Sequence, residues 1–394
     1  MLQALLPYLR RIAMTACFGL LSACAATPTV VQIPHHLLHD QAFTAPQTLP
    51  DANNIFSTSP EMKQFISKEI LQQIRSSSHQ RALFNALYTK AQLKLEYDSS
   101  YTRNAIETFS ARSGNCLSLV IMTAALAKEM GLDVSYQSVT IPENWSRNGA
   151  LYFNVGHVNI VLGKRHFEDR NHMDKNYQMT IDFYPPEETA GQRTIELEEK
   201  TIIAMYFNNR AAESLTTGDL NQSYFWARAS IHADPSFAAA YNTLGVIYLR
   251  HHDDEFAFAA LSKALNLDPD SNVAMSNIIQ AMERTGRTTE ASTMQEKLAH
   301  RQPYPPFHFF KLGVKAMEEK EYSSAKRLFQ KELDRAPDYH EFHFWLGLAH
   351  LRLGEMKMAE QHLAIAKSNS TTQKEHAIYS AKLDQLNAIK TQVH

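Results

Sequence analysis

Three side chains in the middle of the chain have the residue types of a nucleophilic site: Cys116, His157 and Asp182. A cysteine attacks a carbonyl carbon as its thiolate, and an ordinary thiol with a pKa of about 8.5 is mostly protonated at neutral pH. The positive end of a helix and an adjacent histidine both lower the pKa of a thiol, and a carboxylate can orient that histidine. The three residues therefore have the chemistry of a Cys-His-Asp site that forms an acyl-thioester.

The surrounding sequence indicates the elements that must position these side chains. Cys116 begins the apolar run CLSLVIMTAALAKEMG, which predicts a helix that Gly131 ends. Just before it, Gly114 would let the chain turn sharply and a substrate approach the backbone. His157 lies in GHVNIVLG and Asp182 near the start or middle of the apolar MTIDFYP, and both segments are typical of strands. If these strands are antiparallel neighbours, both side chains can reach one site.

Residues 56–200 predict helices first and a sheet second. MKQFISKEILQQI and ALFNALYTKAQLKL have apolar residues at helical spacing. DVSYQSVTI, ALYFNVGHVNIVLG and YQMTIDFYP are the expected strands. The order Cys, His, Asp and the phrase SGNCLSLVIMTAALAKEMGLDVSYQSV resemble the transglutaminase-like cysteine-enzyme superfamily, whose fold is an α+β papain-like arrangement.

That resemblance implies that Cys116 is the nucleophile, His157 the general base and acid, and Asp182 the residue that holds His157. Many members carry an acidic residue two after the cysteine and tryptophan two after the histidine, where this chain has Ser118 and Asn159. These departures, with the insertion PENWSRNGALYFNV between two strands, leave the substrate class open.

Each of the three residues also has a purely structural interpretation. Cys116 could be a buried core thiol, His157 a histidine satisfied within the sheet, and Asp182 a turn or capping residue before two prolines. The backbone N–H of Cys116 is the expected oxyanion donor, with Asn115 and Tyr101 as alternative side-chain donors. The competing histidines, His166 and His172, fall in a charged loop-like stretch; His172 with Asp174 makes a poor metal site.

The N-terminus predicts export and lipidation. Arg10 and Arg11 precede the apolar run IAMTACFGLLSA, so residues 1–23 are predicted as a signal peptide. LSAC resembles the bacterial lipobox, which implies lipidation of Cys24, and Ala25 after it favours an outer-membrane anchor facing the periplasm. Removal of the signal and lipidation of Cys24 would leave Cys116 as the one remaining thiol of the mature chain.

Residues 24–55 are expected to form a flexible tether, because four prolines interrupt a segment without a sustained apolar period. His35, His36 and His39 lie in this segment without a cysteine or carboxylate cluster beside them, so no metal site is predicted there.

The C-terminal half contains a repeat with a period of 34 residues. Pro235, Pro269, Pro303 and Pro337 share this spacing, and Gly245, Gly313 and Gly347 fall on the same register. The pattern resembles the tetratricopeptide repeat, with five repeats over residues 204–372 and a C-terminal capping helix and tail over 373–394. The third repeat is degenerate, with Ile279 at the glycine position and Gln295 where a leucine would pack.

Composition and charge limit the function classes. The 394 residues carry 39 lysines and arginines against 41 acidic residues, so no net field recruits nucleic acid. We therefore expect an α+β papain-like, transglutaminase-like domain followed by an all-α tetratricopeptide-repeat solenoid. The expected function is an envelope-anchored cysteine peptidase, amidase or transglutaminase-type acyltransferase without cofactor or metal, whose repeats bind a protein or peptide segment. The alternative is a non-catalytic interaction lipoprotein with a degenerate enzyme domain.

Overall fold

The computed structural model describes residues 33–75, 78–88, 93, 95–139, 145–148, 151–154, 156–165, 178–183 and 191–393. The elements below all belong to the compact unit His35–His394. The predicted signal peptide, Cys24, His166, His172 and Asp174 lie outside the described residues. Within the described ranges, no helix is long and apolar enough to cross a membrane.

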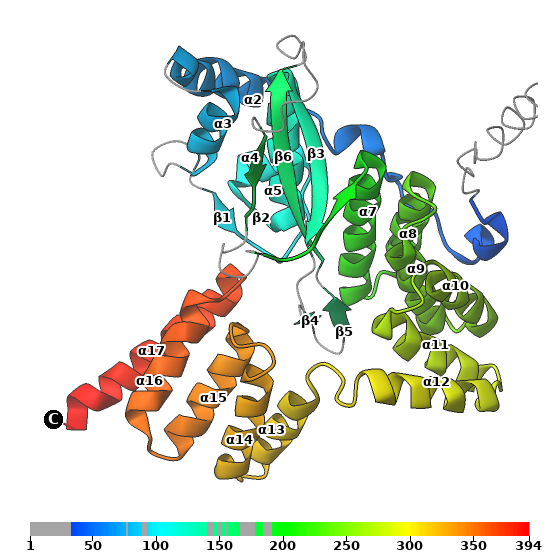
Figure 1. Ribbon diagram of the computed structural model, residues 1–394. Coiled ribbons are helices and arrows are strands. Elements are labelled where there is room, and N and C mark those ends of the chain that lie inside the picture. The colour runs from blue at the N-terminus through cyan, green and yellow to red at the C-terminus, as the bar shows by residue number, and fades with distance from the viewer. Residues whose placement is uncertain are drawn as a thin grey trace, which may run out of the picture. The chain divides into compact units, whose positions relative to one another are not determined.

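Helices precede the sheet in the middle part of the chain (Figure 1). Their bounds are α2 (Pro60–Phe65), α3 (His79–Tyr88), α4 (Ala105–Ala111) and α5 (Cys116–Glu129). α2 continues through a π-helical turn, Ile66–Ile70, into a 3-10 turn, Leu71–Arg75, so the helical prediction for MKQFISKEILQQI is confirmed. Helix α3 covers the first part of the predicted segment ALFNALYTKAQLKL, as far as Tyr88, and strand β1 (Glu96–Tyr97), parallel to β2 (Ser113–Gly114), follows that segment.

Four antiparallel strands form the main sheet, in the order β7-β6-β3-β8. Their bounds are β3 (Leu132–Val139), β6 (His157–Arg165), β7 (Met179–Ile181) and β8 (Thr194–Leu197). A separate hairpin joins β4 (Trp145–Asn148) and β5 (Leu151–Asn154). Asp182 therefore comes directly after β7, not near the start or middle of a strand as expected.

Helix α5 is the central helix of this part, because most of its side chains are buried. Its apolar residues share one core with Tyr136 of β3 and Ile160 of β6. The Asn115 side chain caps its first turn, and Gly131, with φ of 75°, follows its end as predicted.

Five helix hairpins follow, and each is one repeat of the solenoid. Their bounds are α7 (Glu199–Thr216) with α8 (Leu220–Ala233), α9 (Ala238–His251) with α10 (Asp254–Leu267), α11 (Asn272–Arg284) with α12 (Thr288–Arg301), α13 (His308–Glu318) with α14 (Tyr322–Leu333), and α15 (His340–Arg352) with α16 (Met356–Ser368). The first repeat begins at Glu199 rather than near residue 204. α17 (Gln373–Val393) packs on α16 and buries Leu386.

The repeat glycines allow the two helices of a hairpin to touch. A Cβ on Gly245 would lie 2.4 Å from Leu261, and one on Gly313 would lie 2.5 Å from the Phe329 ring. In the third repeat Ile279 occupies this position, and the side chain of Gln295 hydrogen bonds to Glu283 at 2.8 Å.

Residues 35–55 differ from the expected flexible tether. Leu37, Phe43 and Ile55 are buried, and the Phe43 ring stacks on Tyr224 of α8 with centroids 4.1 Å apart. The Tyr248 hydroxyl of α9 donates to the Leu37 carbonyl oxygen at 2.8 Å. Prolines interrupt regular secondary structure in this segment, but its aromatic contacts with the repeats make it part of the folded unit.

Candidate active site at the start of helix α5

Cys116 is the first residue of α5, and its side chain is only 6% exposed. The Asn115 side-chain oxygen accepts a hydrogen bond from the Ser118 backbone N–H at 2.9 Å, which fixes the first turn. Gly114 serves packing rather than the sharp turn or substrate approach expected of it, since a Cβ there would lie 2.7 Å from Ser118 Cβ. The sulfur thus stands at the positive end of a capped helix.

Tyr97 contacts the sulfur, and sequence reasoning missed it. Its hydroxyl lies 3.9 Å from Cys116 Sγ, because the parallel pairing of β1 and β2 sets Tyr97 beside Gly114. Of the two side-chain donors considered earlier, the Asn115 amide is engaged elsewhere, and the ring of Tyr101 packs against an arginine. The Asn115 amide donates to Thr102 Oγ1, and the Arg210 guanidinium lies 3.8 Å from the centre of the Tyr101 ring. A two-residue strand gives too short a pattern for this contact to be predicted.

His157 and Asp182 are in direct contact. His157 Nε2 lies 2.6 Å from Asp182 Oδ1, and the imidazole is almost fully buried. The buried amide of Asn159 points its nitrogen at the other carboxylate oxygen, 3.5 Å away. Asn159, noted in the sequence as a departure from the family pattern, thus faces the carboxylate that holds the histidine.

The strand register places this pair relative to α5. Val158, Ile160 and Leu162 belong to the core shared with α5, so His157 and Asn159 occupy the alternate face of β6. Cys116 lines a cleft that Asp182 also lines. The structure therefore joins His157 and Asp182 directly and sets Cys116 on the cleft that Asp182 lines, while the pairing of Cys116 with His157 stays a prediction.

Tyr88 of α3 contacts Asp182 and lies near Cys116. Its hydroxyl donates to the Asp182 backbone oxygen at 2.6 Å, and its ring stacks on Phe183. Burial, followed by the nearby negative charges of Asp182 and the Cys116 thiolate, raises the pKa of Tyr88 to about 12. Tyr88 is therefore a neutral hydrogen-bond donor at physiological pH, and sequence reasoning did not single it out.

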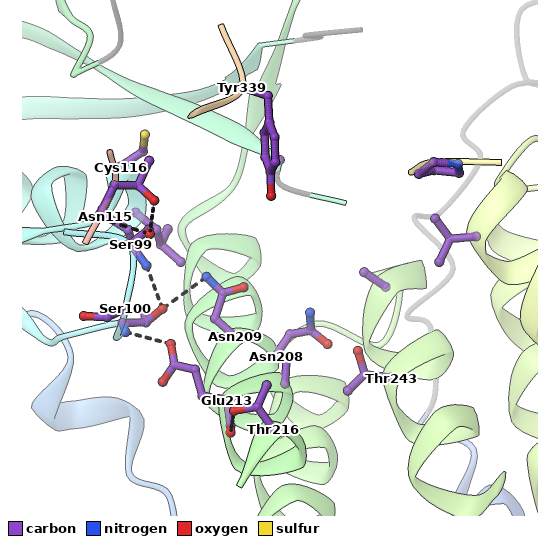
Figure 2. Close-up of a pocket in the computed structure, with 18 of the residues that line it drawn as sticks. Ser99, Ser100, Asn115, Cys116, Asn208, Asn209, Glu213, Thr216, Thr243 and Tyr339 are labelled. Atoms are coloured by element: carbon purple, nitrogen blue, oxygen red, sulfur yellow. Dashed lines mark hydrogen bonds between the residues drawn. The ribbon is translucent and has the colours of Figure 1, made fainter. Parts of the chain in front are cut away.

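The cleft extends from Cys116 along the first helix of successive repeat hairpins, among them α7, α9 and α11, and has a volume of about 3220 Å³ (Figure 2). Polar side chains recur along this repeat face: Asn208 and Asn209 of α7, Asn242 and Thr243 of α9, and Asn277 of α11. The Asn277 amide donates to the Asn242 side-chain oxygen at 2.9 Å. Amides can both donate to and accept from a polypeptide backbone, so this face suits an extended protein segment.

Within the ranges that the structure describes, no group of three or more histidine, cysteine or acidic side chains is placed to hold a metal ion. His39 stacks on Phe256 of α10 with centroids 4.4 Å apart, and its Nδ1 lies 3.6 Å from Asp253.

Comparison with known proteins identifies the repeats. The family model of the tetratricopeptide repeat matches residues 310–373. No curated protein sequence matches the chain. The 34-residue period, the helix hairpins and this match agree. The C-terminal half is a tetratricopeptide-repeat solenoid.

Solved structures similar to the chain include the pilF protein of Pseudomonas aeruginosa, at 18% identity over 49% of this chain and 88% of that chain, with a TM-score of 0.29. YrrB, described as a TPR protein with an unusual peptide-binding site, is 16% identical over 46% of this chain and 92% of its own, with a TM-score of 0.25. MamA from Desulfovibrio magneticus RS-1 is 17% identical over 44% of this chain and 96% of its own, also with a TM-score of 0.25.

Proposed function

We propose that the protein is a cysteine enzyme that acts on a peptide or amide bond in a protein segment held along the tetratricopeptide repeats. One observation carries the proposal: Cys116 and Asp182 line the same cleft as the asparagine-bearing faces of α7, α9 and α11. A segment that lies along these helices can reach the sulfur. The repeats then supply binding, and the middle part supplies chemistry.

The proposed reaction begins with proton transfer from Cys116 to His157. Since Nε2 of His157 is held by Asp182, Nδ1 is the nitrogen that takes the proton. The sulfur attacks the carbonyl carbon, and the backbone N–H of Cys116 with the Tyr97 hydroxyl stabilises the oxyanion. The C–N bond then breaks, and the amine leaves with the proton from His157.

The second half of the reaction releases the acyl group. Water attacks the thioester in a peptidase or amidase, and an amine attacks it in a transglutaminase-type transfer; in both, His157 removes the proton from the attacking group. The cysteine sulfur leaves as thiolate and the site is restored. The papain-like, transglutaminase-like fold assigned to this part is supported by the order of α5 and the antiparallel strands β3, β6 and β7.

We also propose that Cys24 carries lipid and anchors the protein in the outer membrane, facing the periplasm. The support is the LSAC phrase after a basic and apolar N-terminus. An anchored enzyme would act on proteins of the bacterial envelope.

Acyl-thioester formation tests the catalytic part. p-Nitrophenyl acetate should release a burst of p-nitrophenol equal to the protein concentration, with acetyl on the peptide that contains Cys116 in mass spectrometry. Cys116→Ala should abolish the burst, and Asn242→Ala, in the repeat face, should leave it unchanged. Acetylation no faster than that of a small unactivated thiol would contradict the proposal.

A second candidate function is a non-catalytic protein that binds a partner through its repeats. The observation that favours it is the placement of His157 on the face of β6 away from the core of α5. In this case the thiol reacts as an ordinary one, while Asn242→Ala still weakens capture of the partner segment.

A further inference from the structure

Glu213, near the end of the first repeat helix α7, contacts the loop that precedes α4. Its Oε1 accepts a hydrogen bond from the Thr102 backbone N–H at 2.7 Å. Arg210, one helical turn earlier, donates to the Thr102 carbonyl oxygen at 3.3 Å. One repeat helix therefore holds both backbone groups of a residue outside the repeats.

Thr102 connects this contact to the start of α5. The almost fully buried Thr102 hydroxyl oxygen accepts from the Asn115 amide at 2.8 Å and from the Asn209 amide at 3.3 Å. The other end of the Asn115 side chain caps α5 through Ser118. An unbroken series of hydrogen bonds thus runs from Glu213 to the residue beside Cys116, and Figure 2 shows Glu213, Asn209 and Asn115 around the same cleft.

The electrostatics of Glu213 make this series responsive to pH. Burial raises the pKa of Glu213 to about 7, although hydrogen bonds from Thr102 and the charges of Arg210 and Arg103 act in the opposite direction. These two arginines are the charged groups that face Glu213 within the described residues, and burial lowers the pKa of Arg210. A carboxylate accepts a stronger hydrogen bond than a neutral carboxyl group does.

We propose that Glu213 is a positioning residue for Cys116: its ionised carboxylate fixes Thr102, Thr102 fixes Asn115, and the N–H groups at the start of α5 are thereby aligned with the sulfur. The inference rests on the proposed role of Cys116 as the reactive thiol. Because Glu213 and Asn209 also line the cleft, a segment bound along the repeats contacts the same residues that set the thiol.

The pH dependence of stability distinguishes the positioning role of Glu213 from a contribution of Glu213 to stability. The pKa of Glu213 is raised above its ordinary value of 4.5, so its contribution to stability is present below pH 4.5 and is lost as pH rises through about 7. Glu213→Gln, which keeps the shape without the charge, should therefore not lower the unfolding temperature at pH 8. A fall in thiol reactivity there would report on positioning.

The experiment measures the rate of alkylation of Cys116 by iodoacetamide from pH 5 to pH 9 in the full chain, read by mass spectrometry of the peptide that contains it. Wild type and Glu213→Gln should react equally below pH 6, and above pH 7 the variant should be slower by about three- to tenfold, as expected for exchange of a charge-assisted for a neutral hydrogen bond. Thr102→Val, which keeps the backbone N–H but removes the acceptor of Asn115, should be slower at every pH, and Thr102→Ser should restore the rate.

Glu332 supplies the matched control. Its buried carboxylate also accepts hydrogen bonds from backbone N–H groups, those of Phe309 and Phe310, and Arg335 lies 3.3 Å away, but the site is in the fourth repeat. Glu332→Gln should leave the alkylation profile unchanged. Profiles of Glu213→Gln and wild type that coincide at every pH would overturn the inference, even if the wild-type thiol is reactive. A difference above pH 7 with an ordinary wild-type thiol would support the positioning and count against the enzyme.

Discussion

Two phenols lie at the candidate site, one at Cys116 and one at Asp182. The Tyr97 hydroxyl lies 3.9 Å from the sulfur, and Tyr88 donates to the backbone of Asp182, with its pKa raised to about 12. A phenol has one O–H to donate, and that of Tyr88 goes to the Asp182 backbone oxygen, so Tyr97 is the phenol that can donate to negative charge developing at the sulfur.

Replacing Tyr97 tests its contact with the sulfur. Tyr97→Phe removes the hydroxyl that can stabilise the thiolate, so it should raise the pH midpoint of Cys116 alkylation by about half a unit, a small effect for a hydrogen bond to a charge because 3.9 Å is long. The unfolding temperature should change little, since the hydroxyl lies at the cleft. Tyr101→Phe, whose ring packs on Arg210, is the control and should not move the midpoint. An unchanged midpoint in Tyr97→Phe would remove Tyr97 from the site.

The contact between His157 and Asp182 could be anticipated from the sequence, whereas the two phenols could not. Two successive apolar segments rich in β-branched residues are typical of neighbouring antiparallel strands. Side chains on the same face of two such strands lie close together. Tyr88 and Tyr97 depend on the end of α3 and on a two-residue strand, which no periodic pattern marks.

At the scale of elements, close packing between helices governs the repeats. Gly245, Gly313 and Gly347 each lie against a large side chain of the partner helix. The 34-residue period predicted these contacts, because a small residue that recurs at the same position of each repeat lets the two helices of that hairpin pack closely. The early start of α7 was not predicted. Glu199 precedes the first repeated position, and α7 contacts β3 and α5 of the middle part of the chain.

Gly313→Ala should destabilise the solenoid although alanine favours helices over glycine. The new Cβ would lie 2.5 Å from the Phe329 ring, so overpacking should lower the free energy of unfolding by about 1 to 3 kcal/mol. Gly347→Ala meets its nearest neighbour, Leu363, at 3.0 Å and should cost less. Urea unfolding of the full chain would measure both. Equal or increased stability of Gly313→Ala would contradict the packing.

At the scale of the whole compact unit, the segment of residues 35–55 contributes to the fold. It carries His39 and Phe43 onto aromatic side chains of α8, α9 and α10. The sequence did not reveal this, because the partners lie about 180 to 210 residues away and form no local pattern.

Phe43→Ala measures that contribution. Loss of the buried ring should lower the free energy of unfolding by about 3 to 5 kcal/mol, with a lower thermal midpoint. Leu49→Ala, in the same segment but 56% exposed, is the matched control and should be nearly neutral. Equal midpoints for the two variants would restore the view of this segment as a tether.

The proposed activation of the Cys116 thiol by His157 is tested most directly by the dependence of the Cys116 alkylation rate on pH. We expect a midpoint well below the value of about 8.5 for an ordinary thiol, because an imidazolium and the helix start both stabilise the thiolate. His157→Ala should move this midpoint up toward 8.5 without changing the unfolded fraction. A midpoint near 8.5 in the wild type, or a low midpoint that His157→Ala leaves in place, would contradict the Cys-His pairing.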